Sequence, residues 1–98
     1  MRFALHRLAR KEVGDAAAFY SERNASIAAR FLDALERVLH QVARNPHRYR
    51  LIEPNLHQTR IPGFPYVLIY RIDGSEVFVL AVKHDRRRPD YWRDRQDR

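Results

Sequence analysis

A two-stranded hairpin near the C-terminal end constrains the fold more than any other part of the sequence. Residues 67–72 and 76–82 are rich in β-branched and aromatic side chains, which fit the surface of a pleated sheet. Asp73-Gly74 lies between them, and such a pair can adopt the positive φ angles of a two-residue hairpin turn. Residues 77–82 are all apolar, which is typical of a strand covered on both faces. The sequence therefore predicts a sheet that contains this hairpin.

The length and charge of the chain limit its organisation and its partners. With 98 residues, the chain is long enough for one domain, residues 1–98, and too short for two. It has 19 Lys and Arg against 12 Asp and Glu, a formal net charge of +7, which favours polyanions or an acidic protein partner. Residues 1–20 are too charged for a signal peptide, and no segment approaches the ~20 apolar residues that span a bilayer. We therefore expect a cytoplasmic protein without membrane contact.

The N-terminal third predicts a short strand and a helix. Residues 2–6 alternate polar and apolar side chains, as a short strand does. From Leu8 onward, apolar residues recur on one side of a helix, and this face is small enough for close packing. Residues 21–26 are polar and predict a connection, in which Asn24 or Ser26 caps the next helix.

A second helix gives the strongest periodic signal in the chain. Apolar residues recur at spacings of three and four over residues 27–42, and Asn45-Pro46 ends the helix because proline lacks the amide hydrogen. Residues 46–56 contain two prolines and no sustained period, so we expect a surface connection there. A strand over residues 56–61 follows, with a turn or bulge at Pro62-Gly63. The expected fold class is α+β with the order β-α-α-β-β-β, a helical hairpin on a small, mostly antiparallel sheet.

The order of these elements and several local motifs resemble the RelE/ParE superfamily of bacterial type II toxins. The motifs are Asn45-Pro46, Phe64-Pro65-Tyr66 before Val67-Leu68-Ile69-Tyr70, and Ala81-Val82-Lys83-His84 followed by Arg86, Arg88, Pro89, Tyr91 and Trp92. The resemblance covers almost the whole chain. It implies a toxin encoded beside a protein antitoxin that wraps and neutralises it in a hetero-oligomer.

The superfamily divides by target. ParE-like members poison DNA gyrase, whereas RelE-like members cut messenger RNA on the ribosome. The strand motif at residues 64–70 and the length of the two helices resemble the ParE side, so gyrase inhibition is the leading expectation. The alternative is a RelE-like, ribosome-dependent endoribonuclease. A second alternative is an inactive homologue that serves as antitoxin partner and co-repressor.

The basic C-terminal tail, residues 85–98, distinguishes these possibilities together with the end of the last strand. Metal-free RNA cleavage needs a base, an acid and cations that stabilise the charged transition state. His84 can act as base or acid near neutral pH, Arg86 and Arg88 can clamp phosphate oxygens, and Tyr91 can stack on a base or donate a proton. These four residues are the candidate catalytic set.

Each candidate also has a structural interpretation. Strict alternation along the last strand puts His84 on the same face as Phe78, Leu80 and Val82, which favours a histidine at the edge of the core over a catalytic one. The arginines can pair with aspartates of the tail or meet an acidic antitoxin. The aromatic residues of the tail are expected to fold it back onto the body of the protein. The candidate contacts for a target or antitoxin are Arg86, Arg87, Arg88, Tyr91 and Trp92.

The remaining residues predict neither a metal site nor a cofactor. The chain has no cysteine, which excludes disulfides and thiolate ligands. The other histidines are scattered without the spacing of metal ligands; they are His6, His40, His47 and His57.

Overall fold

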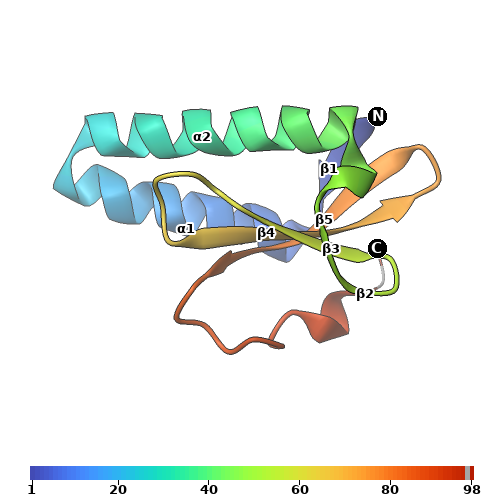
Figure 1. The fold of residues 1–98 in the computed structure, drawn as a ribbon. Coiled ribbons are helices and arrows are strands. Elements are labelled where there is room, and N and C mark those ends of the chain that lie inside the picture. The colour runs from blue at the N-terminus through green and yellow to red at the C-terminus, as the bar shows by residue number, and fades with distance from the viewer. Residues whose placement is uncertain (97) are drawn as a thin grey trace.

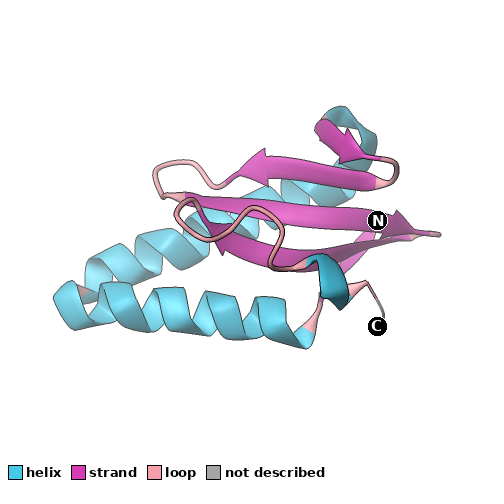
Figure 2. Ribbon diagram, turned by 90° about the horizontal axis from the view of Figure 1, so that it is seen from below, coloured by secondary structure: helices cyan, strands magenta, loops and turns pink. Residues whose placement is uncertain are grey.

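The computed structural model describes residues 1–96 and 98, in which two helices cover one face of a five-stranded sheet (Figure 1). The C-terminal tail crosses the other face, as seen from below in Figure 2. The strand order is β1-β5-β4-β3-β2, and β1 runs parallel to β5 whereas the other neighbouring pairs are antiparallel. The predicted α+β class and element order are confirmed, with one additional strand. The elements are β1 (Arg2–Leu5), α1 (Arg7–Arg23), α2 (Ala25–Arg44), β2 (Arg50–Glu53), β3 (Leu56–Arg60), β4 (Tyr66–Asp73) and β5 (Glu76–His84), with short 3₁₀ helices at Pro46–Arg48 and Arg93–Arg95.

The two helices are joined by a single residue. The prediction of a polar connection over residues 21–26 is wrong, because α1 continues to Arg23 and α2 begins at Ala25. Asn24 breaks the helical path with an extended backbone, and its Oδ1 accepts a hydrogen bond from the Ser26 amide at 2.8 Å. The predicted cap is thus confirmed at Asn24. The polar side chains before it are exposed on the last turn of α1, and this is why polarity alone suggested a loop.

Residues 46–56, expected to be a surface connection, contain the additional strand β2. It is a short edge strand that pairs with β3, and an irregularity in the register interrupts the pairing between Leu51 and Glu53. The β2–β3 turn is fixed from the neighbouring strand. Asn55 adopts a positive φ of 57°, and its side chain exchanges two hydrogen bonds with the backbone of Ile72, at 3.1 and 3.2 Å. Local sequence patterns do not predict this strand, because the segment contains two prolines and its turn depends on a contact between residues 17 positions apart, Asn55 and Ile72.

The predicted hairpin is confirmed, and its turn lies one residue later than expected. Asp73 pairs with Glu76 as the last rung of the ladder, so Gly74 and Ser75 form the two-residue turn. Gly74 has φ +58°, a conformation that costs glycine little because it has no Cβ.

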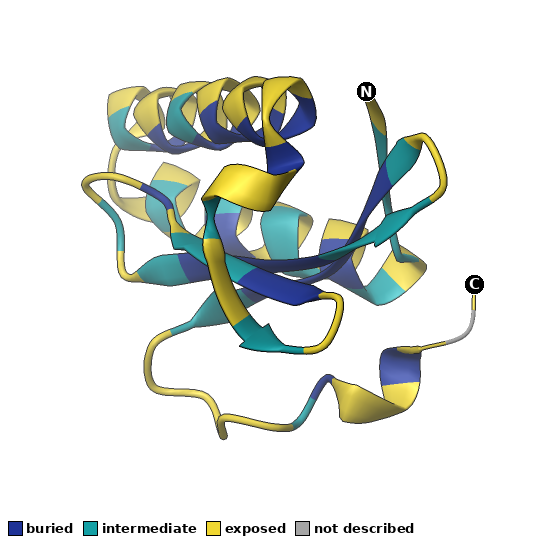
Figure 3. Cartoon of the chain, turned by 45° about the vertical axis from the view of Figure 1, so that its right-hand side comes forward, coloured by how far each residue is buried: buried dark blue, intermediate teal, exposed yellow. Residues whose placement is uncertain are grey.

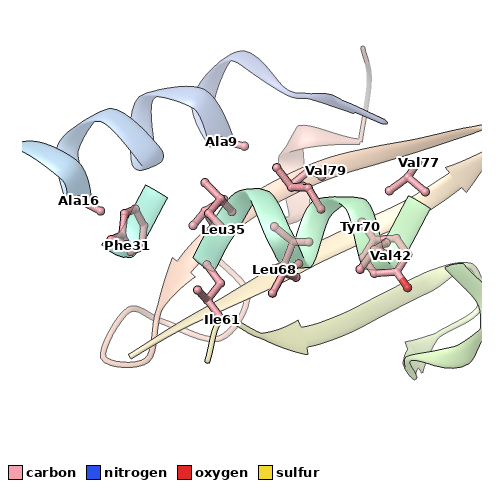
Figure 4. Packing of buried hydrophobic residues seen from close by; sticks show 13 residues of the cluster. Ala9, Ala16, Phe31, Leu35, Val42, Ile61, Leu68, Tyr70, Val77 and Val79 are labelled. Atoms are coloured by element: carbon pink, nitrogen blue, oxygen red, sulfur yellow. The ribbon is translucent and has the colours of Figure 1, made fainter. Parts of the chain in front are cut away.

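Two apolar clusters lie on opposite faces of the sheet. The larger one joins both helices to the sheet and includes Phe31, Leu35, Leu68 and Val79 (Figure 4). The smaller one lies on the other face, where Trp92 from the tail packs with six buried residues of the sheet. Coverage on both faces explains the continuous apolar run of β5, as predicted. The six sheet residues are Leu56, Val67, Ile69, Phe78, Leu80 and Ala81.

Candidate functional site

His84 is the last residue of β5 and sits opposite Tyr66 at the start of β4. The two rings meet edge to face with their centroids 5.0 Å apart. The Nδ1 atom of His84 accepts a hydrogen bond from the backbone amide of Arg86 at 3.0 Å, which begins the turn into the tail. Because Nδ1 acts as an acceptor, the neutral ring carries its proton on Nε2. His84 therefore has a local structural role at the point where the tail leaves the sheet.

His84 lies on a different face of β5 from the one predicted, because a β-bulge precedes it. Along β4–β5, Ile69 pairs with Ala81 and Tyr70 pairs with Val79, so Leu80 is an extra residue without a partner. Leu80 and Ala81 both belong to the cluster on the tail side, whereas Val82 belongs to the cluster under the helices. Strict alternation fails at this point. His84 shares the helix-side register with Val82 and not with Phe78 or Leu80.

Tyr91 is half-buried, and its hydroxyl is committed to a carboxylate. It donates a hydrogen bond of 2.5 Å to Glu12 Oε2, although the two residues are 79 positions apart. Burial raises the pKa of the Tyr91 hydroxyl, and the hydrogen bond to Glu12 raises that pKa further. The phenol therefore keeps its proton at physiological pH and holds the tail against α1.

Glu12 is the residue of this site that sequence reasoning missed. Its carboxylate also accepts hydrogen bonds from the Val82 amide and from the Arg95 guanidinium, and its side chain is largely buried. A signal was present in the sequence, because Glu12 follows Ala9 by three positions and precedes Ala16 by four, within the apolar side of α1. A lone carboxylate at such a position predicts a cationic or hydrogen-bonding partner.

The structure sorts the tail arginines into paired and free groups. Arg87 lies 3.7 Å from Glu12 Oε2 and stacks over the Tyr91 ring at 3.7 Å. Arg86 and Arg88 are exposed, and neither side chain forms an ion pair or hydrogen bond with a described residue. Asp85, an expected partner for these arginines, instead binds Arg60, whose guanidinium lowers the pKa of that carboxyl group. The free cations of the loop are therefore Arg86 and Arg88.

Trp92 is buried to 1 % exposure in the small cluster, and its indole nitrogen donates to the Pro89 carbonyl at 2.9 Å. It therefore offers no surface to a partner in this conformation and belongs to the core. Figure 3 shows the tail as an exposed segment interrupted by buried stretches. Within the tail, residues 85–96 and 98 are described and form turns and one short 3₁₀ helix; residue 97 lies outside the described part. The expectation that the tail folds back onto the protein is confirmed.

A cleft of about 280 Å³ opens between α1, the start of β4, the end of β5 and the tail. It brings together His84, Arg87 and Tyr91 of the predicted residues, whereas Arg86, Arg88 and Trp92 do not line it. Among the residues that the structure describes, no group of three or more His, Cys, Asp or Glu is arranged to hold a metal ion. The described helices include none long and apolar enough to cross a bilayer. The cleft is lined by Glu12, Asp15, Ala16, Phe19, Tyr20, Tyr66, Val82, His84, Arg87 and Tyr91.

Comparison with known proteins identifies the family. A family model described as the ParE toxin of the type II toxin–antitoxin system parDE matches residues 3–89. Among solved structures, the chromosomal ParDE toxin–antitoxin system from P. aeruginosa is similar in fold, with a TM-score of 0.64 at 18% sequence identity over 86% of this chain and 95% of that chain. No individually curated protein matches the sequence. The chain belongs to the ParE toxin family of type II toxin–antitoxin systems.

Proposed function

We propose that this protein is a growth-arresting toxin that inhibits DNA gyrase in the cytoplasm and is neutralised by a cognate protein antitoxin. The family match over residues 3–89 is the observation that carries the proposal. The likeness in fold to a ParDE system agrees with it. In this proposal the protein acts by binding, and the exposed Arg86 and Arg88 meet the acidic or phosphate groups of the gyrase–DNA complex.

The chemistry of the tail favours a binding role over nucleolytic chemistry. A nuclease would need a free acid and a free base beside the scissile phosphate. The Tyr91 hydroxyl is engaged by Glu12, and its raised pKa makes it a weaker proton donor. The Nδ1 atom of His84 is engaged by a backbone amide. Arg86 and Arg88, the cations of the expected catalytic set, do not line the cleft that contains His84.

One observation favours the RelE-like endoribonuclease as the second candidate. The cleft places His84 beside Arg87 and Tyr91, and Nε2 of His84 forms no hydrogen bond with a described residue. That nitrogen carries the ring proton and could donate a hydrogen bond to a phosphate oxygen or to the leaving 5′-oxygen, with Arg87 as the neighbouring cation. Arg87 already interacts with Glu12, which reduces the positive charge that it can direct at a phosphate.

The helical hairpin supplies an antitoxin-docking surface in this proposal. Phe19 on α1 and Leu32 on α2 are large apolar residues that remain 48% and 42% exposed. An acidic, amphipathic antitoxin segment would cover them and complement the net charge of +7. Replacement of Leu32 by Ser should weaken antitoxin binding without loss of fold, whereas Gln41→Ser, at an exposed position about half a turn around the same helix from Leu32, serves as the control.

A supercoiling assay with purified gyrase tests the proposed target. We expect stoichiometric toxin to block supercoiling and to accumulate cleaved DNA. The double variant Arg86→Gln/Arg88→Gln should lose most of this effect, and Arg30→Gln, at an exposed arginine of α2 without an ion pair to a described residue, should retain it. Gyrase that remains fully active beside stoichiometric wild-type toxin would exclude this target.

A further inference from the structure

The edge of β5 changes partner halfway along the strand. β1 pairs with residues 76–79 of β5, and the His6 amide adds a last hydrogen bond to the Val79 carbonyl at 2.9 Å. Beyond that point no strand formed by the described residues continues on this side, although Leu80 and Val82 are buried. A buried backbone group without a partner is destabilising, so this edge needs other donors and acceptors.

Glu12 and Arg95 supply the missing hydrogen bonds. Glu12 Oε1 accepts from the Val82 amide at 3.0 Å, and Arg95 Nη1 donates to the Leu80 carbonyl at 3.2 Å. The same two side chains bind one another through both carboxylate oxygens, at 3.0 and 3.1 Å. One acid–base pair thus replaces a neighbouring strand beside the bulge, and it joins α1, β5 and the tail.

We propose that Glu12 is a positioning residue, the anchor that fixes residues 85–96 of the tail against the sheet. Its side chain and that of Arg95 are only 11% and 8% exposed, and Tyr91 adds a third attachment. Docking of the tail brings Trp92 over the apolar face that the helices leave uncovered. It also sets the position of the loop that carries the free Arg86 and Arg88. This last step rests on the proposed function, in which the two arginines contact the target.

The ion pair of Arg93 is a weaker candidate for this anchoring role. Arg93 pairs with Glu53, and both side chains are more than one third exposed. Ion pairs exposed to water contribute little because solvent screens them and side-chain entropy opposes them. Breaking the Glu12–Arg95 pair would instead leave a guanidinium buried without a counter-charge. The tail should therefore leave the sheet when Glu12 loses its charge.

Trp92 provides a direct probe, because it is the one tryptophan in the sequence and is buried in the docked tail. We expect Glu12→Gln to shift the Trp92 emission to longer wavelength and to increase its quenching by acrylamide. Amide exchange over residues 85–96 should accelerate on the order of 100-fold, with the far-ultraviolet circular dichroism unchanged. The control is Asp15→Asn, an exposed acid that pairs with Lys11 and should leave these signals at their wild-type values.

The possible outcomes distinguish anchoring of the tail by Glu12 from a general contribution of Glu12 to stability. They also test separately whether the docked tail positions Arg86 and Arg88 for the target. Wild-type emission and exchange in Glu12→Gln would overturn the proposal. If Glu12→Gln does not fold, hydrogen exchange of the wild-type protein provides the test. The proposal is supported if the amides of residues 85–96 exchange together and faster than those of β4 and β5. It is overturned if the tail amides exchange only when those of β4 and β5 do. Arg95→Gln should reproduce the tail release, and the double variant should add nothing further. Full growth arrest by a variant with a released tail would overturn the positioning of Arg86 and Arg88. The optical readouts need neither gyrase nor antitoxin, so they hold if the proposed target is wrong.

Discussion

The Tyr70 hydroxyl offers a quantitative test of how the helical layer is tied to the sheet. Tyr70 is fully buried on β4, and its ring stacks on His57 with the centroids 5.1 Å apart. Its hydroxyl donates a hydrogen bond of 2.6 Å to the Pro46 carbonyl, just after the end of α2. Tyr70→Phe removes this donor, keeps the ring, and takes away a hydrogen bond from the carbonyl of buried Pro46.

The expected loss is larger than that of an average hydrogen bond. A typical bond contributes about 1 kcal/mol net, and an unsatisfied buried acceptor costs about 1–3 kcal/mol. We therefore expect Tyr70→Phe to lower the free energy of unfolding by about 2 kcal/mol. In a domain of this size, that change lowers Tm by roughly 8–16 °C.

The assay is urea denaturation followed by circular dichroism, with Tyr20→Phe as the matched control. The Tyr20 hydroxyl forms no hydrogen bond with any described residue, so its removal should change stability by less than about 0.5 kcal/mol. An equal effect of the two substitutions would refute the reasoning, because the hydrogen bond to Pro46 would then contribute nothing specific.

Three further predictions concern packing, backbone conformation and pH. Phe31→Ala, at a ring that is fully buried, should cost about 3–5 kcal/mol in urea denaturation, and Leu32→Ala beside it less than about 1. Gly14→Ala within α1, where an added Cβ meets open space, should stabilise by about 0.5–1 kcal/mol, whereas Gly74→Ala at φ +58° should destabilise by about 1–2. Burial raises the pKa of Tyr70 and Tyr91 in the folded state, so their contribution to stability is complete below the unfolded tyrosine pKa of ~10 and falls as the pH rises above it. Tyr70→Phe should flatten this fall in urea midpoints measured up to about pH 11; an unchanged slope would contradict the assignment.

The parts of the fold that the sequence predicts well are those with local causes. The helical period of residues 27–42, the proline that follows α2 and the turn glycine of the hairpin all act through neighbours in the chain. Strand β2 cannot be predicted from local sequence, because its turn depends on hydrogen bonds between Asn55 and the backbone of Ile72 on another strand. The bulge at Leu80 escapes it because a continuous apolar run carries no period from which the two faces can be told apart.

The candidate site is only half predictable for a related reason. Sequence reasoning finds His84, the arginines and Tyr91 because they are neighbours in a basic, aromatic segment. It cannot tell which tail residues are paired, since Glu12, the acid that binds Arg95 and Tyr91, lies 83 and 79 positions away from them in the sequence. The pairing of Glu12 with the tail gives Tyr91 and Arg87 structural contacts that the local sequence does not reveal.

The most direct test of this account is a measurement of RNA cleavage by the protein. In a translating extract supplied with a defined messenger RNA, we expect the wild-type protein to leave the message intact, because Tyr91 and His84 are held by Glu12 and the backbone. Cleavage by the wild-type protein that disappears in His84→Ala and persists in Arg30→Gln would contradict the account. That result would identify the cleft beside His84 as a ribonuclease site.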